Sequence, residues 1–334
     1  MLSVARHITI LGTVSVSHIL MKLNGSFHLK RDENHKNLME AIVSRRKEVP
    51  LITVSNHRSV MDEPVLLASI MPWHIGIQPR FLRWSICTQH ICFQNGALIS
   101  SFFGAGKTLP IARGDGINQK LLLDFARHLA AGDWGHVFPE GGCWQRQTLG
   151  GRYNGERQGI GNLKWGVGKL IAHCPTRPIV IPFYHFGMEH FVPQDVETRD
   201  ILVSIPHFIG HRVNAVVGSA LNFDDLIEAH EAKYGKLWKY TSSVELDDYT
   251  HPHSQHLPHI GIKSSTTCEV SDDVKFHDIW DSRPEDLILY NQITNRIEDA
   301  LHDLNEQCKA DKIKIADFKM SKHLNIRCSF NVYK

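Results

Sequence analysis

The two residues in this chain with the clearest capacity for chemistry are His57 and Asp62, which lie within residues 54–64. An ionised aspartate that accepts a hydrogen bond from one ring N–H of a histidine fixes the tautomer and leaves the other ring nitrogen free as a base. The same carboxylate stabilises the imidazolium once that base has taken a proton. The pair is therefore suited to removing a proton from a hydroxyl group.

The elements around this pair must bring the two side chains together. Five residues on one straight helix turn through about 500°, roughly 140° away from a shared face, so a single helix cannot do it. Residues 51–54 are a short apolar run, and Pro64 suits the first turn of a helix. We predict a strand-to-helix connection with His57 in the loop and Asp62 where the helix begins. A turn histidine followed by a helix-capping aspartate is the alternative.

The composition is that of a core-forming soluble protein. The chain has 334 residues, of which 42% are hydrophobic and 22% charged, and its net charge is +2. These values exclude a disordered chain and an integral membrane protein, and they argue against a nucleic-acid partner. The seven cysteines are scattered and contain no Cys-x2-Cys pair, so neither a zinc site nor a disulfide scaffold is expected.

Strand and helix patterns alternate through the middle of the chain. The apolar runs predict strands at residues 51–54, 109–112, 135–138, 178–183 and 212–218. Helices are predicted at residues 34–47, 119–131, 164–173 and 224–234, of which the first is polar, the second amphipathic and the last capped by Asp224. This rhythm predicts an α/β fold, a single domain over residues 31–234 with a mixed, largely parallel sheet flanked by helices. A helix and tail over residues 284–334 should pack on that domain.

Three further segments do not fit this rhythm. Residues 1–30 are apolar and contain basic residues but no acid, which favours an interfacial membrane segment, with an ordinary packed helix as the alternative. Residues 73–103 could form either an amphipathic membrane-facing surface or a buried helix. Residues 235–283 are polar and without a period, so a flexible insertion is expected. Its four histidines could bind a metal, but they share no fixed face and no metal site is assigned: His251, His253, His256 and His259.

Polar or glycine-rich positions follow three of the expected strands. Arg113 comes after one strand, Glu140-Gly141-Gly142 after another and His185 near the end of a third. Ligands bind at the carboxyl ends of such strands, arginine suits a phosphate, and successive glycine amides let an anion approach the backbone. We therefore predict a phosphate site beside His57. Each residue also has a plainer reading, as a surface cation, an ion partner or a buried hydrogen-bonding group.

These motifs, in this order, carry a family resemblance. Asn56-His57 with Asp62, Pro110 to Gly116, Phe138-Pro139-Glu140-Gly141, and Ile181-Pro182 with His185 and Gly187-Met188 resemble the ordered motifs of the glycerolipid acyltransferases. The resemblance covers about residues 20–231. It implies that His57 and Asp62 are the catalytic pair and that Arg113, Glu140, Gly141, Gly142 and His185 bind the glycerophosphate part of a lipid. No cofactor is implied.

A subgroup of this family is indicated by residues 132–134, 164–171 and 186–188, which are the more discriminating matches. Members of that subgroup move an acyl chain from a phospholipid to a lysophospholipid without coenzyme A and remodel cardiolipin. The resemblance thus implies cardiolipin and lysocardiolipin as partners, and a peripheral or monotopic place on a mitochondrial membrane that faces the intermembrane space. The oligomeric state is left open and includes a homo-oligomer. One departure is Glu63, where the family commonly has a second aspartate.

The expected mechanism is direct transfer, because the chain has no Gly-x-Ser-x-Gly elbow for a serine nucleophile. His57 would take the proton of the lysolipid hydroxyl as the hydroxyl attacks the donor ester, and then return a proton to the departing alkoxide. Two alternatives remain: a coenzyme A dependent lysophospholipid acyltransferase, and a membrane-binding module that keeps the fold without the chemistry.

Overall fold

The computed structural model describes residues 2–24, 27–94, 96–143, 145, 163–193, 211–240 and 280–330. The four histidines at residues 251–259 and most of the expected insertion at 235–283 lie outside this part of the chain.

The described strands form one seven-stranded sheet in the order β1-β7-β6-β2-β5-β3-β4. Every pairing in it is parallel except that of β6 with β7, which is antiparallel. The strands are β1 (Phe27–Leu29), β2 (Leu51–Ser55), β3 (Trp84–Thr88), β4 (Thr108–Ile111), β5 (Trp134–Val137), β6 (Ile179–Phe186) and β7 (Val213–Val217). The expected mixed, largely parallel sheet is confirmed.

Strands β1 and β3 have no counterpart among the strands expected from the sequence. β3 lies inside residues 73–103, where only a helical or membrane-facing segment was anticipated, so that reading was wrong for Trp84–Thr88. The five residues of β3 do not alternate between apolar and polar types, and their pairing with β4 and β5 determines their conformation. Around β3, short helices fill the rest of the segment: α4 (Trp73–Gly76), η2 (Pro79–Phe81), α5 (Gln89–Cys92) and α6 (Ala97–Ala105).

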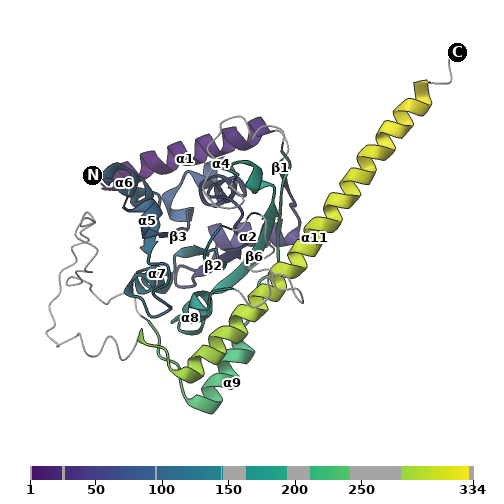
Figure 1. Cartoon of the computed structure of the whole chain (residues 1–334). Helices are drawn as coiled ribbons and strands as arrows, with labels where there is room; N and C mark the ends of the chain where they lie inside the picture. The colour runs from purple at the N-terminus through teal and green to yellow at the C-terminus, as the bar shows by residue number, and fades with distance from the viewer. Residues whose placement is uncertain are drawn as a thin grey trace.

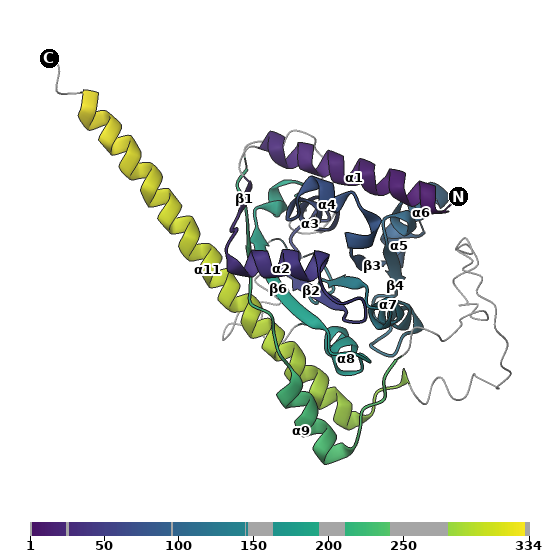
Figure 2. The same cartoon turned by 180° about the vertical axis from the view of Figure 1, so that it is seen from behind.

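Helices cover both faces of the sheet (Figures 1 and 2). On one face pack α7 (Lys120–Ala130), α8 (Gly166–Ala172), α9 (Asp224–Tyr234) and the first part of the long α11 (Pro284–Phe330), whose buried apolar residues run from Leu289 to Cys308. The remainder of α11 extends away from the sheet, so the expected packing on the domain holds only for the first part of this helix (Figure 1). On the other face pack α1 (Leu2–Asn24), α2 (Glu33–Val43) and the continuous turn made by η1 (Asp62–Leu66) and α3 (Leu67–Ser69). The short η3 (Met188–His190) follows β6. Strand β2 alternates between the two cores, with Ile52 and Val54 in the first and Leu51 in the second.

Helix α1 is packed along the helix that begins at Asp62. Ile10, Val14 and Met21 are at most 4% exposed, and the Ser17 hydroxyl donates to the carbonyl oxygen of Pro64 at 2.8 Å. The opposite side of α1 is open and apolar, since Ile8, Ile19 and others there are more than half exposed. Val4–Leu23 is long and apolar enough to cross a membrane by length and composition, the one such helix among the described residues. The packed-helix alternative for the first 30 residues is therefore right for one side of α1.

A disulfide joins Cys87 at the end of β3 to Cys92 in α5, with 6.2 Å between the two Cα atoms. It closes a turn of a few residues and does not hold distant elements together.

Candidate active site

His57 and Asp62 meet where β2 ends and η1 begins. Nδ1 of His57 lies 3.0 Å from Oδ2 of Asp62, so this nitrogen carries the proton that the carboxylate accepts. Nε2 of His57 makes no hydrogen bond within the described residues, and 19% of the side chain is exposed. His57 therefore has one nitrogen fixed by the carboxylate and the other available to a substrate hydroxyl, as the sequence predicted.

The loop between the two residues wraps around the carboxylate. The backbone N–H groups of Arg58 and Ser59 donate to Oδ2 of Asp62 at 2.6 and 2.8 Å. Asp62 is fully buried, and burial by itself raises the pKa of its carboxyl group. The neighbouring imidazoles of His185 and His57 and the loop amides outweigh burial and hold this pKa below its ordinary value. Asp62 is thus kept ionised, which the orienting role requires.

His185 lies under the pair and not in an open pocket. It is inside β6, its side chain has no exposed surface, and its Nε2 donates to the Asn56 carbonyl oxygen at 3.0 Å. The same Nε2 is 3.6 Å from Oδ2 of Asp62; burial lowers the pKa of the imidazole, and the Asp62 carboxylate partly opposes this shift. The amide side chain of Asn56 exchanges two hydrogen bonds with the backbone of His185, at 2.8 and 3.0 Å. This exchange ties the end of β2 to β6.

Glu140 also contacts the pair directly. Its Oε1 accepts the backbone N–H of His57 at 2.8 Å, and the residue is 4% exposed. Just before it, Phe138 stacks on the His57 ring with a centroid distance of 4.2 Å. The Phe-Pro-Glu-Gly motif after β5 therefore holds His57 by a hydrogen bond and a ring contact, a role that its sequence position alone does not show.

Gly141 and Gly142 follow at the edge of the site. Gly141 has φ +66, a conformation that favours glycine, and a Cβ built there would lie 3.1 Å from Cγ of Lys164. Gly141 is exposed, and Gly142 is buried. The Lys164 side chain thus runs over Gly141 and places a cation beside the Glu140 loop. The sequence places Lys164 at the start of an expected helix and in a discriminating motif, and it assigns no site role to this residue.

Arg113 is less close to the pair than the sequence suggested. It is exposed and follows β4, the edge strand, which β5 and β3 separate from β2. Neighbouring strands are about 4.8 Å apart, so about 14 Å lies between the ends of β2 and β4. Arg113 therefore shares the carboxyl edge of the sheet with His57 but not its immediate surroundings.

Glu63, the position that departs from the family pattern, has a buried partner. Its carboxylate forms an ion pair with Arg83, which is 5% exposed, and Nη2 of Arg83 also donates to the backbone carbonyl oxygen of Glu63 at 3.1 Å. Arg83 directly precedes β3. This ion pair ties the start of the helix that carries Asp62 to the far half of the sheet.

Arg58 and Cys143 complete the polar surroundings. The Arg58 guanidinium donates to the Tyr184 hydroxyl and to the Gln145 carbonyl oxygen, both at 3.2 Å. Cys143 is a free thiol that interacts electrostatically with Asp62 and Glu140. Burial, together with these two carboxylates, raises the pKa of the thiol well above its ordinary value. A thiol held protonated is a poor nucleophile, which agrees with direct transfer.

Comparisons with known proteins show which sequences this chain resembles. The Acyltransferase family model matches residues 33–185. N-acylphosphatidylethanolamine synthase of Arabidopsis thaliana is 37% identical over 57% of this chain and 62% of its own length. Tafazzin of Drosophila melanogaster is 36% identical over 63% of this chain and 49% of its own length. The chain thus aligns with less than two thirds of each relative.

Among solved structures, the 1-acyl-sn-glycerophosphate (LPA) acyltransferase PlsC of Thermotoga maritima covers 62% of this chain and 69% of its own, with 14% identity and a TM-score of 0.33. The Acyltransferase match over residues 33–185 and the tafazzin relatives confirm that the chain resembles the glycerolipid acyltransferases, and the tafazzins among them.

Proposed function

We propose that the chain is a phospholipid–lysophospholipid transacylase that works without coenzyme A and remodels cardiolipin on a mitochondrial membrane. The observation that carries the chemistry is the His57–Asp62 pair, with Nδ1 tied to the carboxylate and Nε2 open. The transacylase and cardiolipin parts of the proposal are supported by the likeness to tafazzins.

In the proposed reaction, Nε2 of His57 takes the proton of the lysophospholipid hydroxyl as its oxygen attacks the donor ester carbonyl. The tetrahedral intermediate collapses, and the imidazolium returns the proton to the departing lysolipid alkoxide. Asp62 stays ionised throughout and balances the imidazolium charge. The acyl ester changes carriers, and no external reactant is consumed.

We assign the surrounding residues to two groups. Arg113, Gly141 and Gly142 keep their proposed role in binding the lipid phosphate, and Lys164 joins them because it lies over Gly141. Glu140 and His185 have protein partners, so we propose that they position His57 and Asp62 and do not themselves contact the lipid.

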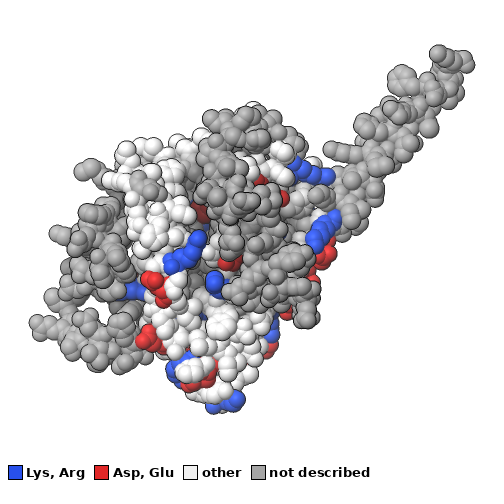
Figure 3. Space-filling model, viewed as in Figure 1, with Lys and Arg blue, Asp and Glu red and all other residues white. Residues whose placement is uncertain are grey.

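A membrane surface is the proposed setting. The exposed side of α1 and the neighbouring α4, α5 and α6 carry large apolar side chains that are 43% or more exposed: Ile8, Leu11, Ile19, Trp73, Ile91, Leu98, Ile99 and Phe102. Figure 3 shows the face near α1 and α6 as an area without charge, whereas Lys, Arg, Asp and Glu gather toward α9. The Cys87–Cys92 disulfide suits an oxidising compartment, in keeping with the proposed intermembrane-space side.

The deciding experiment incubates purified protein with a labelled phospholipid and lysocardiolipin in the absence of any thioester. Labelled cardiolipin is the expected product. No transfer until acyl-coenzyme A is added would instead establish the coenzyme A dependent alternative. His57→Ala should lower the rate about 10²- to 10⁴-fold while vesicle binding is kept, whereas His302→Ala on α11 serves as the control. Equal turnover in His57→Ala would falsify the role of this base.

A second acceptor follows from the other relative, whose name describes an N-acylphosphatidylethanolamine synthase. The same base could deprotonate the amine of phosphatidylethanolamine, which would then form an amide. Offering lysocardiolipin and phosphatidylethanolamine together separates the two activities, because mild alkali cleaves the ester product and leaves the amide intact.

A further inference from the structure

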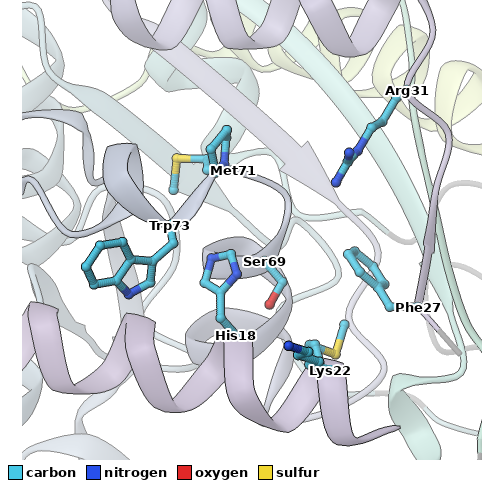
Figure 4. Close-up of a pocket in the computed structure, with 9 residues that line it drawn as sticks. His18, Lys22, Phe27, Arg31, Ser69, Met71 and Trp73 are labelled. Atoms are coloured by element: carbon cyan, nitrogen blue, oxygen red, sulfur yellow. The ribbon is translucent and has the colours of Figure 1, made fainter. Parts of the chain in front are cut away.

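The helix that begins at Asp62 has a pocket at its other end. A pocket of about 520 Å³ opens between α1, the start of α4 and the chain around β1. Figure 4 shows His18 and Lys22 rising into it from α1, Arg31 reaching in from beyond β1, and Trp73 facing them. The η1–α3 turn separates this pocket from Asp62 by about 10 Å, at 1.5 Å per residue.

The charged groups of the pocket are all basic. Lys22 and Arg31 are exposed, no acidic side chain lines the pocket, and neither residue forms an ion pair within the described residues. Asp32, which follows Arg31 in the sequence, lies 3.6 Å from Lys30 and caps α2 by accepting from the His35 N–H. Two cations that line one cavity from different elements, without a counter-charge among the described lining residues, favour an anion there.

His18 does not add a third charge. Its Nε2 lies 3.1 Å from the Ala68 carbonyl oxygen, and burial lowers the pKa of the ring. The neutral imidazole instead joins α1 to α3, so the wall of the pocket is fixed to the helix that carries Asp62.

The rest of the lining is apolar and continues onto the open side of α1. Phe27, Met71 and Trp73 line the pocket, and Trp73 is 46% exposed. Beside Lys22 on α1, Ile19 and Leu23 are 57% and 61% exposed. A ligand with a phosphate in the pocket would therefore have an apolar surface for its chains.

We propose that this pocket binds the phosphate of an anionic phospholipid belonging to the bilayer on which α1 lies, as a site separate from the His57–Asp62 pair. Lys22 and Arg31 hold the phosphate, and Trp73 and Phe27 contact the glycerol region. The acyl chains run along the exposed side of α1. The proposal uses the membrane placement of α1 but is independent of the reaction at His57.

A photoactivatable phosphatidic acid, with the reactive group near its glycerol, tests the site in phosphatidylcholine vesicles. Irradiation of the wild-type chain and peptide mapping should place the label on Phe27 or Trp73. Label confined to residues 56–63 and 138–143 would overturn the proposal. The same label should persist in His57→Ala, and its loss there would show that the pocket is part of the active site.

Charge variants supply the second measurement. Lys22→Gln with Arg31→Gln should reduce pocket labelling tenfold or more, since each basic group near an anionic surface changes affinity about fivefold. Arg31→Lys should retain most of the labelling. Arg80→Gln, an exposed cation on η2, is the matched control and should leave it unchanged. Equal losses in the control and the pocket variants would point to diffuse attraction and contradict a built site.

A competition experiment distinguishes a lipid phosphate from free inorganic phosphate as the ligand of the pocket. Soluble inorganic phosphate should displace the label only weakly, because it lacks the apolar part that Trp73 and Phe27 contact. If inorganic phosphate abolished the labelling at concentrations comparable to that of the lipid, the pocket would be a site for free phosphate. The proposal of a lipid site would then be wrong.

Discussion

Glu140 Oε1 accepts the backbone N–H of His57 at 2.8 Å, so the loop after β5 holds the base on the loop after β2. The contact crosses between two parallel neighbouring strands whose carboxyl ends lie at the same edge of the sheet. It accounts for a glutamate that is 4% exposed next to the site.

Glu140→Gln should keep most of the activity, because the amide oxygen of glutamine can still accept the His57 N–H. Glu140→Ala leaves that N–H without a partner, and we expect kcat to fall about tenfold or more, with a smaller change in KM. The measurement is kcat and KM of the wild type and of both variants in the transacylase assay. A rise in KM alone would show that Glu140 binds the lipid, as the sequence first suggested.

Asp62 makes the stability depend on pH in a defined direction. Its pKa is lower in the folded chain than in the unfolded one, so its stabilisation is complete above the ordinary carboxyl value of about 4 and is lost as the pH falls through the lower folded value. We therefore expect urea unfolding between pH 6 and about 3 to show a difference in the free energy of unfolding between the wild type and Asp62→Asn. This difference should become smaller in the acid range. A difference in the free energy of unfolding that does not change with pH would contradict the lowered pKa of Asp62.

Glu63 and Arg83 are expected to act as a unit. Glu63→Ala leaves the Arg83 cation buried without its carboxylate, and we expect a loss of about 3 kcal/mol in the free energy of unfolding. Adding Arg83→Met to that variant should restore part of the lost free energy of unfolding, because the buried unpaired charge is removed. If the double variant is as unstable as the sum of the two single variants, the pair is not coupled.

Two isoleucines two residues apart, on opposite sides of α1, separate membrane contact from folding. Ile8 is 66% exposed and Ile10 is 1% exposed. Ile8→Glu should weaken flotation with vesicles and leave the thermal unfolding midpoint unchanged. Ile10→Glu should lower the midpoint sharply, since it buries a carboxylate in the core. If Ile8→Glu has no effect on flotation, the exposed side of α1 does not face the membrane.

Cys143 distinguishes direct transfer from an acyl-enzyme. Because its thiol is held protonated beside two carboxylates, Cys143→Ser should retain activity within about twofold. A loss as large as that of His57→Ala would assign the acyl group to this cysteine, and trapping the labelled acyl chain on the protein would then confirm it.

The sequence by itself determined the alternation of strands and helices, and with it the α/β fold. It also determined the strand-to-helix connection at His57 and Asp62, because a short apolar run, a proline and a five-residue spacing are local features. The sequence pattern does not predict strand β3, because its residues become a strand through pairing with β4 and β5.

Only the tertiary structure decided which residues meet the base. Glu140, His185 and Arg113 all follow or end strands, yet the sheet order puts β5 and β6 beside β2 and leaves β4 at the edge. Glu140 therefore contacts His57, His185 lies beneath Asp62, and Arg113 stands apart. Strand order is fixed by contacts between residues far apart in the chain, which no local pattern of residue types records.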